Sequence, residues 1–201
     1  FYTLGCKVNQ YETNAMTQKF QEAGYEIVNM NESIADIYIV NTCTVTNMSD
    51  RKSRQILRRL KDKNKNAIIV AVGCYAQVAK KELEDMQEID IALGNEEKKD
   101  IVQYVERFIL EKNKLVQIED ISIQKEFKDM GKITYSEKTR AVIKIQDGCN
   151  QFCSYCIIPY ARGRVRSRKQ ESIMDEITKI AQKGIKEVVI TGIHVASYGR
   201  D

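Results

Sequence analysis

The stretch AIIVAVGC, residues 67–74, decides the fold class. Its first six residues are continuously apolar, which is typical of a strand buried on both faces of a parallel sheet. A glycine and a cysteine follow at once. An apolar strand pattern that leads into a cysteine also occurs in FYTLGC (residues 1–6) and in IYIVNTC (residues 37–43). The stretch therefore predicts one strand of a parallel sheet in which several strands are followed by a cysteine.

Strand and helix patterns alternate on both sides of this stretch. Short apolar runs predict strands at residues 1–4, 36–40, 67–72 and 89–93. Apolar residues at helical spacing predict the intervening helices at residues 12–23, 49–62, 78–86 and 97–111. This alternation predicts an α/β N-terminal domain, residues 1–111, built on a doubly wound parallel sheet.

A second alternation begins after a weakly patterned, charged segment. Residues 112–138 are expected to form a linker, with a short strand at 115–118. The remainder, residues 139–201, predicts a strand at 140–146, a helix at 171–183 and a strand at 187–191. Two strands and one helix cannot close a core of their own. We therefore expect the chain to be a fragment that stops inside its second domain.

Composition and charge bound the classes of function. Of the 201 residues 43% are hydrophobic and 30% charged, which fits a globular chain with a real core. The apolar runs are far too short to cross a bilayer, and no signal peptide is visible, so we expect no membrane partner and a cytoplasmic location. The net charge of +4 conceals two basic runs, at residues 51–65 and 160–169. One such run is typical of a solvated surface, but two favour a polyanionic partner such as nucleic acid.

Three of the six cysteines follow predicted strands: Cys6, Cys43 and Cys74. Because the carboxyl ends of parallel strands meet at one edge, these thiols are expected to converge on a ligand site. The alternative is three separate buried core thiols, and their shared topological position favours the ligand site. Nearby, Asn9 and Gln10 are candidates to line that site or to act as turn or cap residues.

The other three cysteines fall within eight residues, in GCNQFCSYCIIPYARG, residues 148–163. They have C-x3-C-x2-C spacing in a loop between a strand and a helix. A structural zinc site takes four ligands, and the single histidine, His194, lies far along the chain. Gathered thiolates are instead typical of iron–sulfur centres. In a cubane of four irons, three cysteines leave one iron open for a substrate or cofactor, and this logic applies to both sets.

The second set resembles the radical S-adenosylmethionine (SAM) enzymes, whose motif is C-x3-C-x-aromatic-C. Other segments narrow the resemblance to the methylthiotransferases, which carry a second three-cysteine cluster in an N-terminal domain. Those segments are TLGCKVNQYET (3–13), NTCTVT (41–46), VGCYAQ (72–77) and GCNQFCSYCIIPYARGRVRSR (148–168). The first is most similar to the branch that acts on N6-threonylcarbamoyladenosine beside the anticodon of tRNA. Sister branches act on isopentenyladenosine of tRNA or on a ribosomal protein.

The resemblance implies a fold and two [4Fe–4S] clusters. The fold is an N-terminal doubly wound domain that binds the auxiliary cluster, followed by the first units of a truncated radical SAM (βα) partial barrel. One cluster, whose open iron binds SAM, is held by Cys149, Cys153 and Cys156. The auxiliary cluster, which carries the sulfur to be inserted, is held by Cys6, Cys43 and Cys74. Tyr155 matches the position that packs near the SAM adenine, and Gly192 falls where the family contacts the SAM amino-acid moiety.

The implied function is that of an enzyme, a tRNA methylthiotransferase that adds a methylthio group to C2 of N6-threonylcarbamoyladenosine. Its partners are tRNA and an external electron donor, and the sequence sets no oligomeric state. Because most of the family's barrel and its RNA-binding domain are absent, we expect this length of chain alone not to turn over. Two other hypotheses stay open: a non-catalytic iron–sulfur module, disfavoured because electron carriers use four ligands per cluster, and a zinc-binding nucleic-acid adaptor.

Four alternate arginines follow the second cysteine set. In an extended segment they would lie on one side and suit contacts to phosphates. The alternative is a basic loop that faces solvent without a partner. The residues predicted to bind RNA are Arg162, Arg164, Arg166 and Arg168.

Overall fold

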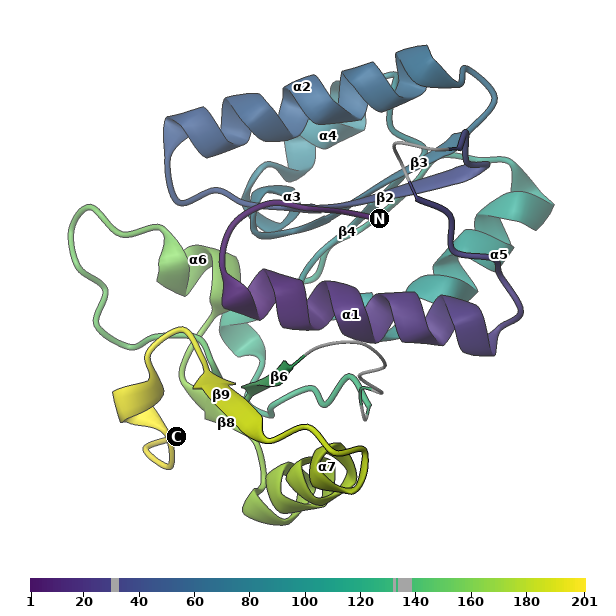
Figure 1. Cartoon of the computed structure of the whole chain (residues 1–201). Helices are drawn as coiled ribbons and strands as arrows, with labels where there is room; N and C mark the ends of the chain where they lie inside the picture. Colours follow the sequence, from purple (N-terminus) through teal and green to yellow (C-terminus); the bar gives the residue numbers. More distant parts are fainter. Residues whose placement is uncertain (30–32, 132, 134–138) are drawn as a thin grey trace.

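The computed structural model describes residues 1–29, 33–131, 133 and 139–201. Its main unit is a five-stranded parallel sheet with strand order β1-β2-β3-β4-β5 (Figure 1). The strands are β1 (Tyr2–Thr3), β2 (Ile37–Thr42), β3 (Ile68–Gly73), β4 (Ile91–Leu93) and β5 (Leu115–Gln117). The predicted parallel α/β sheet is confirmed.

Helices cover both faces of this sheet. They are α1 (Lys7–Glu22), α2 (Asn47–Lys63), α3 (Cys74–Val78), α4 (Lys80–Asp85) and α5 (Ile101–Glu111), with a 3-10 turn, η1 (Glu97–Asp100), before α5. Helices α1 and α5 lie on one face, and α2 and α4 lie on the other (Figure 1). Helix α1 begins at Lys7 rather than at residue 12, because its N-cap is Cys6, a residue type that gives no capping signal.

The central strand β3 supplies side chains to both layers of the core. Val70 and Val72 pack in the cluster beneath α1 and α5, whereas Ile69 and Ala71 pack in the cluster beneath α2 and α4. All four are fully buried. Burying one aliphatic side chain the size of valine or isoleucine stabilises a fold by about 1.5–3 kcal/mol. The continuous apolar sequence of this strand therefore follows from its place between two helical layers.

The second region contains one complete strand–helix–strand unit. Strands β6 (Arg140–Lys144) and β9 (Glu187–Thr191) pair in parallel, and helix α7 (Gln170–Gln182) lies between them in sequence, as predicted. The elements that the sequence did not predict are β7 (Gln146–Asp147), α6 (Ile158–Arg162), β8 (Arg166–Ser167) and the 3-10 turns η2 (Ile121–Ile123) and η3 (Val195–Ser197).

The two regions share one core. Strand β5 pairs in parallel with β4, so the N-terminal sheet extends past residue 111 to Gln117. The short strand expected at 115–118, within the segment predicted to be a linker, is present as β5, and residues 132 and 134–138 lie outside the described residues. Ala141 and Ile143 of β6 join the same buried cluster as Met16 of α1. The second region therefore packs directly on the α1 face.

Candidate functional site

The first three cysteines lie at the carboxyl edge of the parallel sheet. Cys6 follows β1 and is exposed, whereas Cys43 follows β2, Cys74 follows β3, and both are buried. Burial raises the pKa of the Cys43 thiol, and the neighbouring Cys74 and Cys6 raise it further. The Cys43 thiol is therefore electrostatically coupled to both of the other thiols of this set.

Two glycines explain why a Gly-Cys pair recurs at these sites. Gly73 precedes Cys74 with φ 102°, and Gly148 precedes Cys149 with φ 71°. A Cβ at Gly73 would lie 2.6 Å from the Thr42 carbonyl oxygen, and one at Gly148 would lie 1.8 Å from the Arg164 carbonyl oxygen. Only glycine adopts such a conformation at no steric cost and leaves room for the neighbouring strand or loop.

The edge that carries the first set is held by Asn9 of α1. Its buried amide nitrogen donates to the carbonyl oxygens of Leu4 (2.7 Å) and Thr42 (3.0 Å), and so joins the ends of β1 and β2. Gln10, its neighbour, is exposed and donates to Asn14 on the same helix. Of the two polar residues that the sequence placed near Cys6, only Asn9 builds this edge.

The second set lies in the loop between β7 and α6 and is more open. The Cys149 amide donates to the Gly163 carbonyl oxygen (3.0 Å), and the Cys156 amide donates to that of Cys153 (2.9 Å). Cys153 is exposed, and the other two cysteines are half-buried. Tyr155 is 92% exposed at the surface of this loop.

Gly192, predicted to contact SAM, comes directly after β9. A Cβ there would lie 2.9 Å from Oε1 of Gln146, so the backbone passes close to that side chain. The same Oε1 accepts the amide of His194 (2.7 Å). The single histidine therefore forms part of the turn beyond β9, and its Nδ1 pairs with Ser197.

The structure corrects the prediction of an RNA-facing row of arginines. Arg162, Arg166 and Arg168 are 0%, 1% and 2% exposed, so the interpretation as surface phosphate ligands is wrong for all three. The segment is not one extended strand, because α6 ends at Arg162 and β8 begins at Arg166. Only Arg164 is exposed, with its guanidinium carbon 4.4 Å from the centre of the Phe152 ring.

The three buried arginines contact carboxylates of both regions. Arg162 pairs with Glu12 of α1 and with Asp147 (3.4 Å). Lys98 and Lys144 also pair with Glu12, at 2.5 Å and 2.8 Å. Arg166 pairs with Glu96 and Asp147, and Arg168 pairs with Glu176 and Asp129. Several of these pairs join the second region to the N-terminal domain.

Glu12 is the shared acceptor of this network, and its charge state follows from its neighbours. Burial alone would raise the pKa of Glu12, but Arg162, Lys144 and Lys98 hold it well below its usual range. Asp147 behaves in the same way, because Lys144 and the two arginines at 162 and 166 lower its pKa against the effect of burial. Both carboxylates are therefore charged at neutral pH. Sequence reasoning missed this network, in which directly paired residues such as Glu12 and Arg162 are 150 positions apart.

The surroundings of Cys74 fit a thiolate ligand of a cluster. Its sulfur accepts a hydrogen bond from Nε of Arg162 (3.1 Å), and the amide nitrogen of Asn95 lies 4.0 Å away. Within the described residues, no group of three or more Cys, His, Asp or Glu side chains converges on a single metal ion. A cubane binds each thiolate to a different iron, so its ligands surround the cluster rather than one point. The donor set of three thiols therefore fits an iron–sulfur cluster better than one ion.

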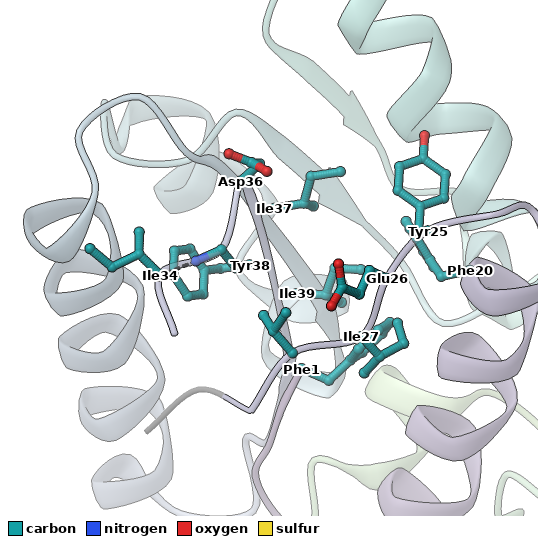
Figure 2. Close-up of a pocket in the computed structure, with 12 residues that line it drawn as sticks. Phe1, Phe20, Tyr25, Glu26, Ile27, Ile34, Asp36, Ile37, Tyr38 and Ile39 are labelled. Atoms are coloured by element: carbon teal, nitrogen blue, oxygen red, sulfur yellow. Dashed lines mark hydrogen bonds between the residues drawn. The ribbon is translucent and has the colours of Figure 1, made fainter. Parts of the chain in front are cut away.

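A cavity in the described structure lies elsewhere. It has a volume of about 190 Å³ and is lined by apolar side chains near the amino end of β2, among them Phe1, Phe20, Tyr25, Ile37 and Ile39 (Figure 2). The cysteines follow the carboxyl ends of the strands, so this cavity is separate from both thiol sets. Among the described helices, none is both long and apolar enough to pass through a bilayer.

Comparison with known proteins agrees with both regions. Residues 1–94 match the sequence model of Uncharacterized protein family UPF0004, and residues 143–200 match that of the Radical SAM superfamily. The superfamily implies SAM and an iron–sulfur cluster as cofactors.

Individual relatives match the chain along its whole length. A threonylcarbamoyladenosine tRNA methylthiotransferase of Aquifex aeolicus is 44% identical over all of this chain and 49% of that protein. Its namesake in Bacillus subtilis is 42% identical over 100% of this chain and 44% of that protein. A ribosomal protein uS12 methylthiotransferase of Clostridium novyi is 41% identical over 99% of this chain and 45% of that protein. The chain spans about half the length of these curated relatives. The chain therefore contains a Radical SAM superfamily region and is similar over its whole length to methylthiotransferases of that superfamily.

Proposed function

We propose that the protein that contains this chain is a tRNA methylthiotransferase that acts on C2 of N6-threonylcarbamoyladenosine. The observation that carries the proposal is the pair of three-cysteine sets, each of which leaves a fourth cluster position without a protein ligand. The relatives in Aquifex aeolicus and Bacillus subtilis, both named for that substrate, support the choice of nucleoside. A cytoplasmic location, an external electron donor and tRNA as partner belong to the same proposal.

The cysteines would hold two [4Fe–4S] clusters. One would be bound by Cys149, Cys153 and Cys156, and the auxiliary one by Cys6, Cys43 and Cys74. When bound, these groups supply the reductive cleavage of SAM and the sulfur to be inserted. The chain's own part is to hold the thiolates and to exclude water from the auxiliary edge, where Cys43 and Cys74 are buried.

Three further residues have roles in this proposal. Tyr155 and Gly192 would contact the adenine and the amino-acid moiety of SAM. Arg164 would contact tRNA phosphate, since it is the one exposed member of the four arginines and carries a charge that suits a phosphate oxygen.

Anaerobic reconstitution tests the cluster assignment. We expect about eight irons and eight sulfides per chain, and about four of each when the second set is replaced by alanine. The matched variant replaces the first set by alanine. It should also keep about four irons, and it should retain the spectral change on addition of SAM that the other variant loses. Tightly held zinc in place of iron would refute the proposal.

The ribosomal-protein branch is the second candidate, because the uS12 methylthiotransferase of Clostridium novyi is almost as similar to this chain. Deletion of the full-length gene separates the two. We expect 2-methylthio-N6-threonylcarbamoyladenosine to disappear from tRNA digests while the mass of ribosomal protein uS12 stays unchanged. The reverse result would assign the chain to the ribosomal branch.

A further inference from the structure

The side chain of Arg162 connects the two cysteine sets. It is the last residue of α6, the short helix that follows the second set, and it is fully buried. Its Nε donates to the sulfur of Cys74, a member of the first set, at 3.1 Å. Helix α6 itself packs against α3, the helix that Cys74 begins. A residue placed by one set therefore touches a sulfur of the other.

The rest of the Arg162 guanidinium is fixed by acceptors of the N-terminal domain. Nη1 and Nη2 both donate to the carboxylate of Glu12, and Nη2 also donates to Oδ1 of Asn9. Asn95 adds a second link, because its amide donates to the carbonyl oxygen of Ala161 (2.6 Å) beside the same sulfur. A planar guanidinium held on two sides has one orientation, so its third edge is aimed at Cys74.

The charges around Arg162 favour a negative sulfur at that edge. Among the described residues, the ion pairs connected through Glu12 and Asp147 contain four buried cations and three buried carboxylates. The cations are Lys98, Lys144, Arg162 and Arg166, and the carboxylates are Glu12, Asp147 and Glu96. A buried charge without a partner is costly. A metal-bound thiolate at Cys74 would supply a fourth negative charge.

We propose that Arg162 is a positioning residue for the auxiliary cluster. Its guanidinium holds the Cys74 sulfur in place and raises the reduction potential of the cluster. The inference rests on the proposed function, since it requires that Cys6, Cys43 and Cys74 bind a [4Fe–4S] cluster. Hydrogen bonds to ligand sulfurs, and nearby positive charge, favour the reduced cluster because reduction adds one negative charge. The auxiliary site is therefore complete only when the second region is docked on the first.

The test uses the whole chain with Cys149, Cys153 and Cys156 replaced by alanine, so that only the auxiliary cluster contributes a signal. In this background Arg162→Lys keeps the charge but shortens the donor, and Arg162→Gln also removes the charge. Arg168→Lys is the matched control, because Arg168 is also buried between the two regions. It donates hydrogen bonds to Tyr11 and Glu176, and among the described residues it has no hydrogen bond to a cysteine. Each reconstituted variant is titrated with dithionite and followed by electron paramagnetic resonance.

We expect the midpoint potential to fall in Arg162→Lys, to fall further in Arg162→Gln, and to stay unchanged in Arg168→Lys. Loss of iron in the Arg162 variants, with iron retained in Arg168→Lys, would support the same role. An unchanged potential in Arg162→Lys, or equal shifts in Arg162→Lys and Arg168→Lys, would overturn the inference while leaving the cluster assignment intact. If the parent background binds no cluster, the proposed function itself fails.

A second measurement leaves Arg162 unchanged, so it does not depend on whether an Arg162 variant folds. The parent background is grown with ¹⁵N-labelled arginine, reconstituted and reduced, and the cluster is examined by electron spin echo spectroscopy. We expect a ¹⁵N coupling from the guanidinium that donates to Cys74. The coupling should persist in Arg168→Lys, and its absence from the parent background would overturn the inference.

Discussion

The two cysteine sets differ in how much of their surroundings the fold provides. Cys43 and Cys74 are each 5% exposed and lie between strand ends, a short helix and a buried charge network. Cys153 is exposed in a loop, and Tyr155 beside it is 92% exposed. The comparison teaches that one site is shaped by packing before any cofactor binds. The second set, by contrast, lies in an exposed loop that shields its thiols from solvent much less.

The largest expected effect removes the shared acceptor of the buried network. Glu12→Gln leaves Arg162, Lys98 and Lys144 without their common carboxylate, and breaking a buried ion pair costs about 3–5 kcal/mol. Urea unfolding at pH 7 measures the loss. The control is Glu22→Gln, an exposed position on the same helix. A loss below about 1 kcal/mol would contradict the idea that this network shapes the first site.

Gly73, which precedes Cys74, tests whether the first cysteine set depends on a backbone conformation that favours glycine. In Gly73→Ala we expect a loss of about 3 kcal/mol, from the positive φ and from the contact with the Thr42 carbonyl. The same change at Gly24, where φ is 86° and a Cβ meets nothing within 4 Å, should cost only about 1–2 kcal/mol. Thermal unfolding compares the two. Equal losses would show that the close approach at Gly73 contributes nothing.

Acid should weaken the buried network in a defined pH range. The pKa values of Glu12 and Asp147 are lower in the folded protein than in the unfolded chain. Their contribution to the free energy of unfolding is therefore full above the unfolded pKa values, near pH 4, and is lost as the pH falls through the folded ones. Each pH unit that separates the folded from the unfolded pKa corresponds to about 1.4 kcal/mol. Urea unfolding from pH 7 to pH 3 should bring the wild type and Glu12→Gln together. Parallel curves would be inconsistent with this.

The cysteine sets should also differ in reactivity before any cluster is bound. In the reduced, metal-free chain we expect iodoacetamide to modify Cys153 at least about tenfold faster than Cys43 or Cys74, because the buried thiols react only after local opening. Burial also raises the pKa of Cys43, which lowers its thiolate fraction. Mass spectrometry of quenched digests gives each rate. In urea the six rates should converge, and similar rates in the folded chain would remove the contrast between the sets.

The smallest expected effect concerns the exposed loop. Arg164→Ala removes a cation that lies over the Phe152 ring, a contact that contributes about 0.5–1 kcal/mol at an exposed site. Thermal unfolding should register a small change, and the affinity of the full-length protein for tRNA, its proposed partner, should fall uniformly across sequences. An unchanged tRNA affinity would count against a phosphate contact there.

The sheet and the first thiol set could be predicted because their signals are local. The apolar run in β3 and the cysteines after three strands are visible in short windows of sequence. The parallel topology then places the ends of these strands at the same edge of the sheet. Helices α3 and α6 have five residues each, too few to show a period. The buried arginines were misjudged because the alternation of Arg162 to Arg168 assumes an extended chain. Their partners, such as Glu12, lie on distant elements and leave no local pattern.

The close approach between the two regions has a consequence for recombining relatives. The carbonyl oxygen of Ile121 lies 2.5 Å from where a Cβ at Gly163 would stand, and Arg162, the residue before it, pairs with Glu12 of α1. A chimera that joins this N-terminal half to the barrel of a relative must keep Gly163 together with both partners of that ion pair. The residues that must be kept together lie on one surface between the two regions but are far apart in the sequence. A single crossover point in the gene therefore cannot exchange them as one block.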